Sequence, residues 1–511
     1  MTSRRVTRGL GQAAAVAVVA ALTAPVAHAV PERAPATAPV AAPVPAKAKP
    51  QAKPEDFNGD GYRDVVVSAP GANMEDTLKP GYLAVFYGGR SGPLHERRTL
   101  IHQDSPGVPG TAETGDSFGS TSATGDLDRD GYTDLVVSAG SEDVGAVRDA
   151  GTVAVLWGGP KGLTSGATLK NGVRERGELG AQMAVGDFDG DGDADLVLSE
   201  ASGSVLHTLS GPFRRNGTPA ASAVLQDDNA IYLRDLAAGD VNGDRKDDLV
   251  TIQQEWRDDE SVEGRTHMLM VRRGTAQGLG ATGSYVEGRN TQADQVTVGD
   301  VNKDGYEDLV LGRPEERYQG DQPIDKGGKV TWIPGSAQGP VVAKGRAFNQ
   351  DSPGIPGAAE GLDQRRHGDR FGTGVTVGDI NGDGYAEIVV GVPGEELDGR
   401  DEAGAVVVLR GTKSGPTGTG AQAFSQNTAG VPGTAEARDG FGGTAKVVDT
   451  NRDGRGELLV SAVGENWHAG SVWVFKPTAT GATAKGSVAI SQSTLGLYPN
   501  ASDYFGNSFN Q

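Results

Sequence analysis

Short apolar runs rich in Val, Leu and Ile recur along this chain, and each one follows an acidic loop. They are VVVSA after Asp64, LVVSA after Asp134, LVLSE after Asp195, LVTI after Asp248, LVLG after Asp308, IVVG after Glu387 and LLVSA after Glu457. A second β-rich run follows in most repeats, for example GYLAVFYGG from Gly81 and GTVAVLWGG from Gly151. Runs of this length between Gly-rich turns predict strands rather than helices.

The acidic loops are seven copies of one segment. They begin at Asp56 (DFNGDGYRD), Asp126 (DLDRDGYTD), Asp187 (DFDGDGDAD), Asp240 (DVNGDRKDD), Asp300 (DVNKDGYED), Asp379 (DINGDGYAE) and Asp449 (DTNRDGRGE). Successive copies start 53 to 79 residues apart. This irregular spacing suits blades with variable loops better than a solenoid with fixed rungs.

Each copy has side-chain oxygens at positions 1, 3, 5 and 9, and six of the seven have Gly at position 6. Ca²⁺ takes about six to eight oxygen ligands, and a tight loop with acidic residues at alternate positions wraps them around one point. The sequence therefore predicts up to seven Ca²⁺ sites. The candidate ligands are Asp56, Asn58, Asp60 and Asp64; Asp126, Asp128, Asp130 and Asp134; Asp187, Asp189, Asp191 and Asp195; Asp240, Asn242, Asp244 and Asp248; Asp300, Asn302, Asp304 and Asp308; Asp379, Asn381, Asp383 and Glu387; and Asp449, Asn451, Asp453 and Glu457.

One such loop by itself could equally be a hairpin turn, since Asp, Asn and Gly are common in turns. Seven copies with the same ligand spacing favour the metal interpretation. The formal net charge of −20 agrees, because uncompensated carboxylates at close range repel one another. We expect the fourth site to be the weakest, because Arg245 replaces the Gly at position 6. The same negative charge argues against nucleic acid as a partner.

The order of the runs in one repeat is strand, acidic loop, strand, loop, strand, turn, strand. This order predicts an all-β, seven-bladed β-propeller with four-stranded antiparallel blades. The last repeat ends in Tyr504-Phe505-Gly506 with no acidic loop after it, whereas the first acidic loop has no Phe-Gly strand before it. We therefore expect residues from about Ser502 to Gln511 to supply the first strand of the first blade and to close the ring.

The repeats resemble FG-GAP repeats, the unit of integrin alpha-subunit propellers and of many exported bacterial proteins. The resemblance rests on Phe-Gly pairs such as Phe118-Gly119 and Phe371-Gly372, on Gly-Ala-Pro-like turns and on the acidic loops. It covers about residues 55 to 511 and is weakest in blades three to five. It implies that ligands meet the face opposite the calcium loops.

The N-terminus predicts export. Arg4, Arg5 and Arg8 precede an apolar run from Ala13 to Leu22 that is too short to span a membrane, and Ala27-His28-Ala29 fits a cleavage site. We assign residues 1–29 to a signal peptide, 30–54 to an Ala/Pro-rich linker and 55–511 to the propeller. The general and the twin-arginine export routes both remain open, and no membrane span is expected after cleavage.

The expected function is a secreted or cell-surface binding or adhesion module for an extracellular protein or glycan. The alternative is an extracellular polysaccharide lyase or hydrolase on the same propeller. Gly115-Asp116-Ser117-Phe118-Gly119 matches the G-x-S-x-G pattern of serine hydrolases. However, Arg370, Gly440 and Tyr504 replace Ser117 in the other copies, so we expect no catalytic role for it. Candidate binding loops are Gly71–Lys79, Gly140–Ala150, Pro314–Lys326, Gly394–Ala403 and Gly464–Ala469.

Overall fold

The structure is a computed structural model of the 511-residue chain. It describes residues 54–74, 77–92, 97–201, 205–226, 230–256, 265–288, 290–316, 318–319, 322–323, 325–362 and 368–510. All of them belong to one compact unit, Lys49–Gln511. The expected signal peptide and the linker up to residue 53 lie outside the described residues, so their assignment stays a prediction.

The described residues form seven antiparallel sheets whose strands pair in chain order. The first sheet contains β1(Val65–Ala69), β2(Tyr82–Phe86) and β3(Arg98–Ile101), and the second contains β4(Phe118–Gly125), β5(Asp134–Ala139), β6(Thr152–Trp157) and β7(Ser165–Asn171). The third contains β8(Met183–Gly186), β9(Asp195–Ser199), β10(Val205–Ser210) and β11(Ala221–Gln226), and the fourth β12(Ala230–Gly239), β13(Asp248–Trp256), β14(Arg265–Arg272) and β17(Ser284–Tyr285).

The fifth sheet contains β18(Gln295–Gly299), β19(Asp308–Arg313), β22(Lys329–Ile333) and β23(Arg346–Phe348), and the sixth β24(Thr373–Gly378), β25(Glu387–Val392), β26(Ala405–Arg410) and β27(Thr417–Phe424). The seventh contains β28(Ala445–Val448), β29(Glu457–Ala462), β30(Ser471–Thr478) and β31(Gly481–Ser491). Two small hairpins, β15(Gly274–Thr275) with β16(Gly278–Leu279) and β20(Tyr318–Gln319) with β21(Gln322–Pro323), and three short helices, η1(Val342–Lys344), α1(Glu465–His468) and η2(Ser493–Leu495), lie in the connections.

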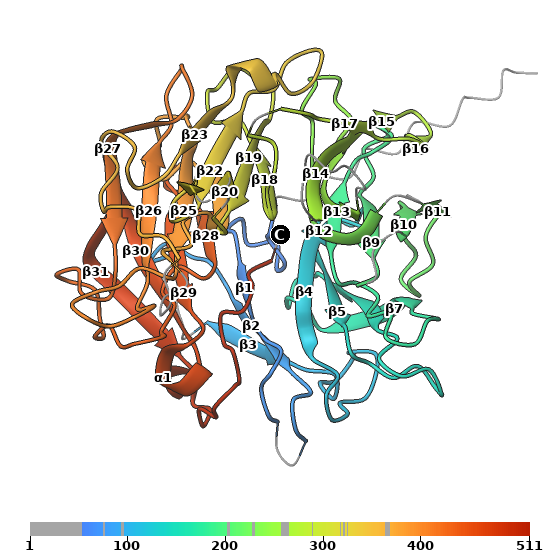
Figure 1. Ribbon diagram of the computed structural model, residues 1–511. Helices are drawn as coiled ribbons and strands as arrows, with labels where there is room; N and C mark the ends of the chain where they lie inside the picture. Colours follow the sequence, from blue (N-terminus) through green and yellow to red (C-terminus); the bar gives the residue numbers. More distant parts are fainter. Residues whose placement is uncertain are drawn as a thin grey trace, which may run out of the picture. The chain divides into compact units, whose positions relative to one another are not determined.

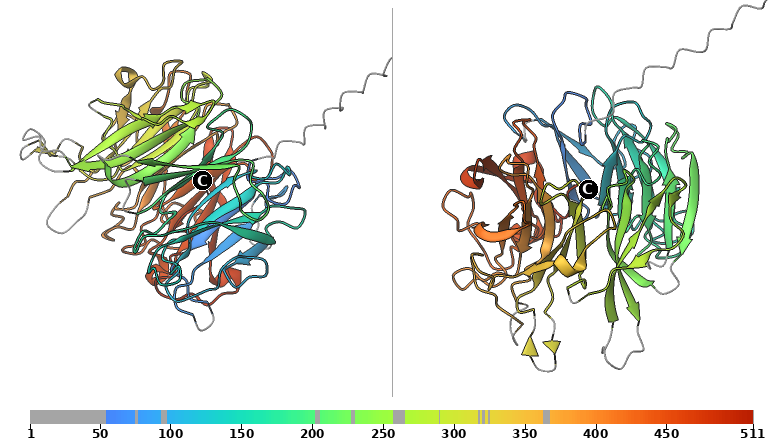
Figure 2. Two further views of the ribbon diagram at one scale, coloured as in Figure 1. Left: turned by 90° about the vertical axis from the view of Figure 1, so that its right-hand side faces the viewer. Right: turned by 90° about the horizontal axis from the view of Figure 1, so that it is seen from above.

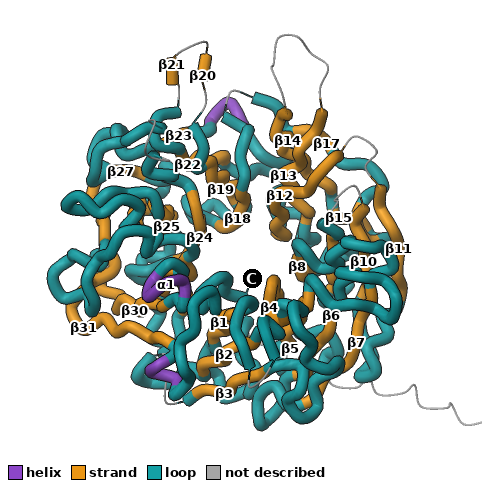
Figure 3. The backbone as a smooth tube through the Cα atoms, turned by 60° about the horizontal axis from the view of Figure 1, so that its bottom comes forward, coloured by secondary structure: helices purple, strands orange, loops and turns teal. Residues whose placement is uncertain are grey.

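The seven sheets are the blades of a β-propeller. Figures 1 and 3 show the first strand of each blade nearest the middle of the ring, with the later strands of the blade farther out. Neighbouring inner strands contact one another in the order β1, β4, β8, β12, β18, β24 and β28. Figure 2 shows the same blades from two further sides, with the connecting loops at the ends of the strands. The all-β, seven-bladed fold that the sequence predicts is confirmed.

The core lies between the blades. Each of seven hydrophobic clusters combines side chains from two adjacent blades, and one of them joins the last blade to the first. The acidic loops lead into strands such as β1, β5 and β29, in which every residue is buried. These strands are covered on both faces, which explains their continuous apolar sequences. An outer strand such as β11 is mostly exposed.

The first blade departs from the expected four strands, because its sheet has three. The C-terminal segment lies beside β1 through a single isolated bridge between Val67 and Phe509. The Gly506 N–H donates to the Ser68 carbonyl (2.9 Å), and the Ser68 N–H donates to the Ser508 carbonyl (3.1 Å). On its other side, Lys446 of β28 donates to the Asn510 carbonyl (2.7 Å). The segment thus contacts both end blades without forming a regular strand, and closure of the ring by it remains a prediction.

Candidate metal centres

In six blades the acidic loop connects the first strand to the second, and in the first blade it leads directly into β1. Equivalent connections of an up-and-down meander lie at the same end of every blade, so the seven loops share one face of the ring. The backbone has positive φ at positions 4 and 6 of all seven loops, for example at Arg129 (60°) and Gly131 (89°). Position 6 was expected from its Gly residues, whereas position 4 was missed because Arg or Lys occupies it in three copies.

One hydrogen-bond frame recurs in the loops. The N–H at position 6 donates to the position-1 carboxylate in every copy, over 2.8 to 3.0 Å. The N–H at position 2 donates to the position-9 carboxylate in six copies, over 2.9 to 3.2 Å. The position-1 carboxylate of every copy and the position-9 carboxylate of six copies are thereby held against the same small turn. The frame fixes its acceptor oxygens around one point, as a cation site requires.

The carboxylate at position 9 is buried at the base of each loop. In the five copies with Asp there, one oxygen accepts the N–H of a Gly that follows the strand paired with the one the loop enters, for example Gly88 after β2 for Asp64 and Gly158 after β6 for Asp134. Burial is the main cause that raises the pKa of Asp64 to about 7 and that of Asp134 to about 8, and nearby carboxylates add to it. A positive ion at the loop would reverse this preference for the neutral form.

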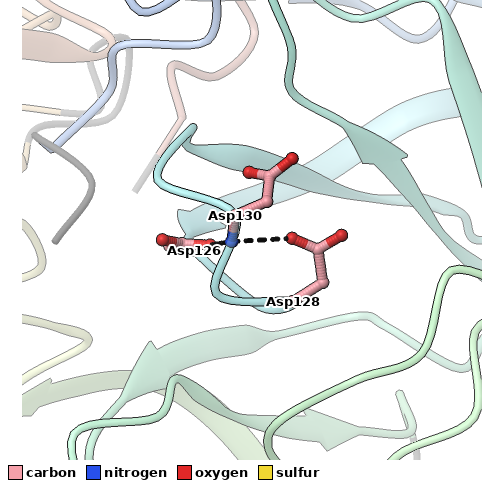
Figure 4. A group of neighbouring side chains, drawn as sticks. All are labelled: Asp126, Asp128 and Asp130. Carbon is pink, nitrogen blue, oxygen red and sulfur yellow. Dashed lines mark hydrogen bonds between the residues drawn. The ribbon is translucent and has the colours of Figure 1, made fainter. Parts of the chain in front are cut away.

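Carboxylates converge most closely in the second and third loops. Three carboxylates within 4.8 Å of one another are found among the described residues at Asp126, Asp128 and Asp130 and at Asp187, Asp189 and Asp195. Figure 4 shows the first group, in which the Asp130 N–H donates to both Asp126 (3.1 Å) and Asp128 (3.2 Å). The other five loops have Asn at position 3, so fewer carboxylates meet there.

The donor sets fit a hard divalent cation, because they consist of carboxylate and amide oxygens. In the first loop, the buried Oδ1 atom of Asp56 has no hydrogen-bond partner among the described residues. The assignment of all seven ligand sets stays a prediction.

Arginine side chains that the sequence did not single out contact these loops. The Arg215 guanidinium, from the third blade, pairs with both Asp128 and Asp130 of the second and stacks on Trp157, 5.1 Å from its ring centroid. Arg97 pairs with Asp60 over 2.9 Å. These cations neutralise part of the carboxylate charge in the absence of a metal, and Arg215 stands where it would compete with one.

The fourth loop differs from the others. Arg245 adopts the positive φ of the missing Gly (67°), so the turn itself is retained. The Arg273 guanidinium contacts Asp248 over 3.2 Å, and the Lys246 ammonium lies 3.7 Å from Asp244. Positive side chains therefore surround this loop, which adds a reason for the expectation that it binds calcium least well.

Ser117 immediately precedes β4, and its hydroxyl donates to the Gly115 carbonyl over 3.1 Å. It enters an antiparallel strand rather than the strand-to-helix turn that a hydrolase nucleophile occupies. The described residues contain no helix long and apolar enough to cross a membrane.

The model of the FG-GAP repeat family matches residues 54–86, 118–156, 179–210, 293–330 and 371–409. The chain is similar to integrin alpha pat-2 of Caenorhabditis briggsae, with 32% identity over 266 residues, which is 50% of this chain and 20% of that protein. It is similar to integrin alpha-8 of Mus musculus, with 26% identity over 283 residues, 53% of this chain and 23% of that protein.

A third similarity is to phosphatidylinositol-glycan-specific phospholipase D of Rattus norvegicus, with 33% identity over 146 residues. This aligned part is 28% of the chain and 17% of the phospholipase. The chain therefore spans about a fifth of the length of these relatives.

Proposed function

Since the chain is an FG-GAP repeat protein with an integrin alpha-like β-propeller, we propose that it is a secreted or cell-surface, calcium-stabilised binding module for an extracellular protein or glycan. The observation that carries this proposal is the sevenfold recurrence of one acidic loop in one hydrogen-bond frame. The acidic loops occupy one face of the ring, so the opposite face is available to a partner.

Calcium is proposed as the ion because the donors are oxygens in a compact, flexible turn. Positions 1, 3, 5 and 9 of each loop would hold it. A bound divalent ion supplies the positive charge that lets the buried position-9 carboxylates stay ionised. Because an ion that binds only the folded state stabilises it, weak sites at several loops add their effects.

The binding role is supported by the loops at the opposite end of the blades. One of them, in the last blade, carries Trp467 with 87% of its surface exposed. An exposed aromatic side chain is a frequent anchor for a partner. Tyr318 belongs to another of these loops, Pro314–Lys326, and its side chain lies outside the described part of the structure.

The catalytic activity named for the phospholipase relative is not carried over to this chain, because the alignment covers only 17% of that protein. A polysaccharide lyase or hydrolase remains the second candidate from the sequence, and no feature of the described residues favours it over binding.

Calcium dependence is tested by thermal unfolding in millimolar Ca²⁺ and in excess chelator. We expect the melting temperature to fall by many degrees in chelator. Equal melting temperatures in the two conditions would contradict a structural role for the ion.

The binding role is tested with arrays of extracellular proteins and of glycans, probed with the full chain in calcium and in chelator. Calcium-dependent capture of a defined ligand supports a binding module. Release of shortened oligosaccharides from a polysaccharide, without stable capture, would favour the enzyme instead.

A further inference from the structure

A hollow of about 370 Å³ lies between the sixth and seventh blades. Its walls include Glu402, from the connection between β25 and β26, and His468, from the connection between β29 and β30. The metal loops of these blades connect β24 to β25 and β28 to β29. Alternate connections of a meander lie at opposite ends, so the hollow opens on the face away from the metal loops.

Two arginines give the hollow a cationic wall. Arg370 and Arg438 both line it, both are exposed, and neither has an ion-pair partner within the described part of the chain. Their backbones are fixed, since the Arg370 carbonyl accepts the Thr373 hydroxyl (2.9 Å) and the Arg438 N–H donates to the Asp401 carbonyl (2.9 Å). A guanidinium group binds a carboxylate or sulfate through two N–H donors in a forked geometry.

Two carboxyl groups, those of Glu402 and Asp439, also line the hollow. Asp439 is buried, and one of its oxygens accepts the Glu436 N–H over 2.7 Å. Burial raises the pKa of Asp439 above its ordinary value. Glu402 is half-buried and already interacts with another group of the chain. The exposed residues of the lining are Arg370, Arg438, His468 and Asn507.

Gly440 lines the hollow and adds no side chain to it. Its counterparts in the repeats are Ser117, Arg370 and Tyr504, and all four have positive φ, between 54° and 62°. A Cβ atom at Gly440 would meet only Pro393, at 3.9 Å. Position 440 therefore has room for a side chain, as the equivalent turns do. Between the sixth and seventh blades no side chain occupies this space.

The exposed Trp467 immediately precedes His468 of the lining in the chain. Asn466, Trp467 and His468 have consecutive positive φ values of 51°, 62° and 65°. Three successive left-handed residues other than Gly are unfavourable. The Ser502 N–H donates to the Trp467 carbonyl (3.3 Å), and the Tyr504 N–H donates to the His468 carbonyl (2.9 Å). The C-terminal segment thus holds Trp467 outward, and strain of this kind collects at functional sites.

Resting on the proposed binding function, we infer that this hollow binds an anionic sugar residue, with Arg370 and Arg438 on its carboxylate or sulfate group and Trp467 on a ring face. The guanidinium groups suit the acidic substituent of such a sugar, and the flat indole suits the apolar face of its ring. The chain has a net charge of −20, which opposes non-specific binding of polyanions. An acidic peptide would use the arginines but would have no ring for the indole.

The test is isothermal titration of the full chain, saturated with calcium, with four probes. They are trigalacturonate, its methyl ester, a sulfated disaccharide and triglutamate. We expect trigalacturonate or the sulfated disaccharide to bind, and the one that binds identifies the acidic group. If that group is the carboxylate, the methyl ester should bind at least about tenfold more weakly than trigalacturonate. Equal binding of the ester and the acid, with no binding of the sulfated sugar, would overturn the inference. Stronger binding of triglutamate than of either acidic sugar would favour a peptide ligand and also overturn it.

The location is tested with matched variants. Gly440→Tyr should block the hollow without removing a charge, whereas Ser117→Tyr places the same side chain at the equivalent turn of the second blade. The double variant R370Q/R438Q and Trp467→Ala should each weaken binding about tenfold or more, while Arg214→Gln, at an exposed arginine on another part of the ring, should not. Unchanged melting temperatures exclude misfolding.

Retained binding in both Gly440→Tyr and R370Q/R438Q would refute this site even if the arrays had established a binding module. Failure of the arrays to find any ligand, together with no binding of the four probes, would instead refute the proposed function itself.

Discussion

Phe505 offers a sharp test of how the ring is closed. Its side chain is fully buried in the cluster that joins the last blade to the first, and its ring stacks on Tyr82 with centroids 6.5 Å apart. Phe441 is the equivalent Phe of a Phe-Gly pair in the seventh blade and is equally buried. Replacing a buried Phe by Ala costs about 3–5 kcal/mol through lost transfer energy and the cavity left behind.

If the C-terminal segment unfolds together with the blades, Phe505→Ala and Phe441→Ala should cost the same free energy of unfolding. The entropy of unfolding is about 2.1 cal/mol/K per residue, so in a unit of this length each kcal/mol lowers the melting temperature by roughly 1 °C. We therefore expect both variants to melt roughly 3–5 °C below the parent chain. The measurement is thermal unfolding in millimolar calcium, with size-exclusion chromatography of the same samples.

The refuting result is a Phe505→Ala variant that melts with the parent chain while Phe441→Ala does not. The C-terminal segment would then detach by itself, and the ring would be held without it. Deletion of residues 500–511 is a second test of the same closure. It should expose the edge of β1, lower the melting temperature and promote aggregation far more than deleting residues 30–47.

Three further outcomes are expected. Asp191→Ala should lose more calcium than Asp244→Ala by native mass spectrometry, because the third loop has four carboxylates and the fourth is surrounded by cations; equal losses would contradict the ranking. Arg215→Gln should raise the calcium affinity of the second loop severalfold in titration calorimetry, since a competing guanidinium is removed; a lower affinity would mean that Arg215 orients the ligands. Burial raises the pKa of Glu142 to about 7 from an unperturbed 4.5, so its contribution to stability is present below about 4.5 and is lost as the pH rises through about 7. Between pH 5 and pH 8 in chelator, the melting temperature should fall less in Glu142→Gln than in the parent chain. Equal falls in the two proteins would rule out Glu142 as the cause.

The sequence alone was sufficient to predict the strands, the seven repeats and the seven-bladed propeller. The physical reason is that each acidic loop is a local structure. The two hydrogen bonds of its recurring frame join residues seven and five positions apart, as from Phe57 to Asp64 and from Gly61 to Asp56. The apolar runs after the loops are continuous because both faces of those strands are buried, and this pattern is also visible in the sequence.

Other features depend on residues that only the tertiary structure brings together. Arg215 reaches Asp130 across 85 positions of the chain, and Gly88, 24 positions from Asp64, reaches it from the end of β2. Residues of two blades line the hollow at Gly440, so its shape depends on how both blades pack. Because the packing of blades sets these distances, no spacing in the sequence could have revealed the cationic competitor or the hollow. The same holds for the C-terminal segment, whose irregular path between β28 and β1 only the folded ring defines.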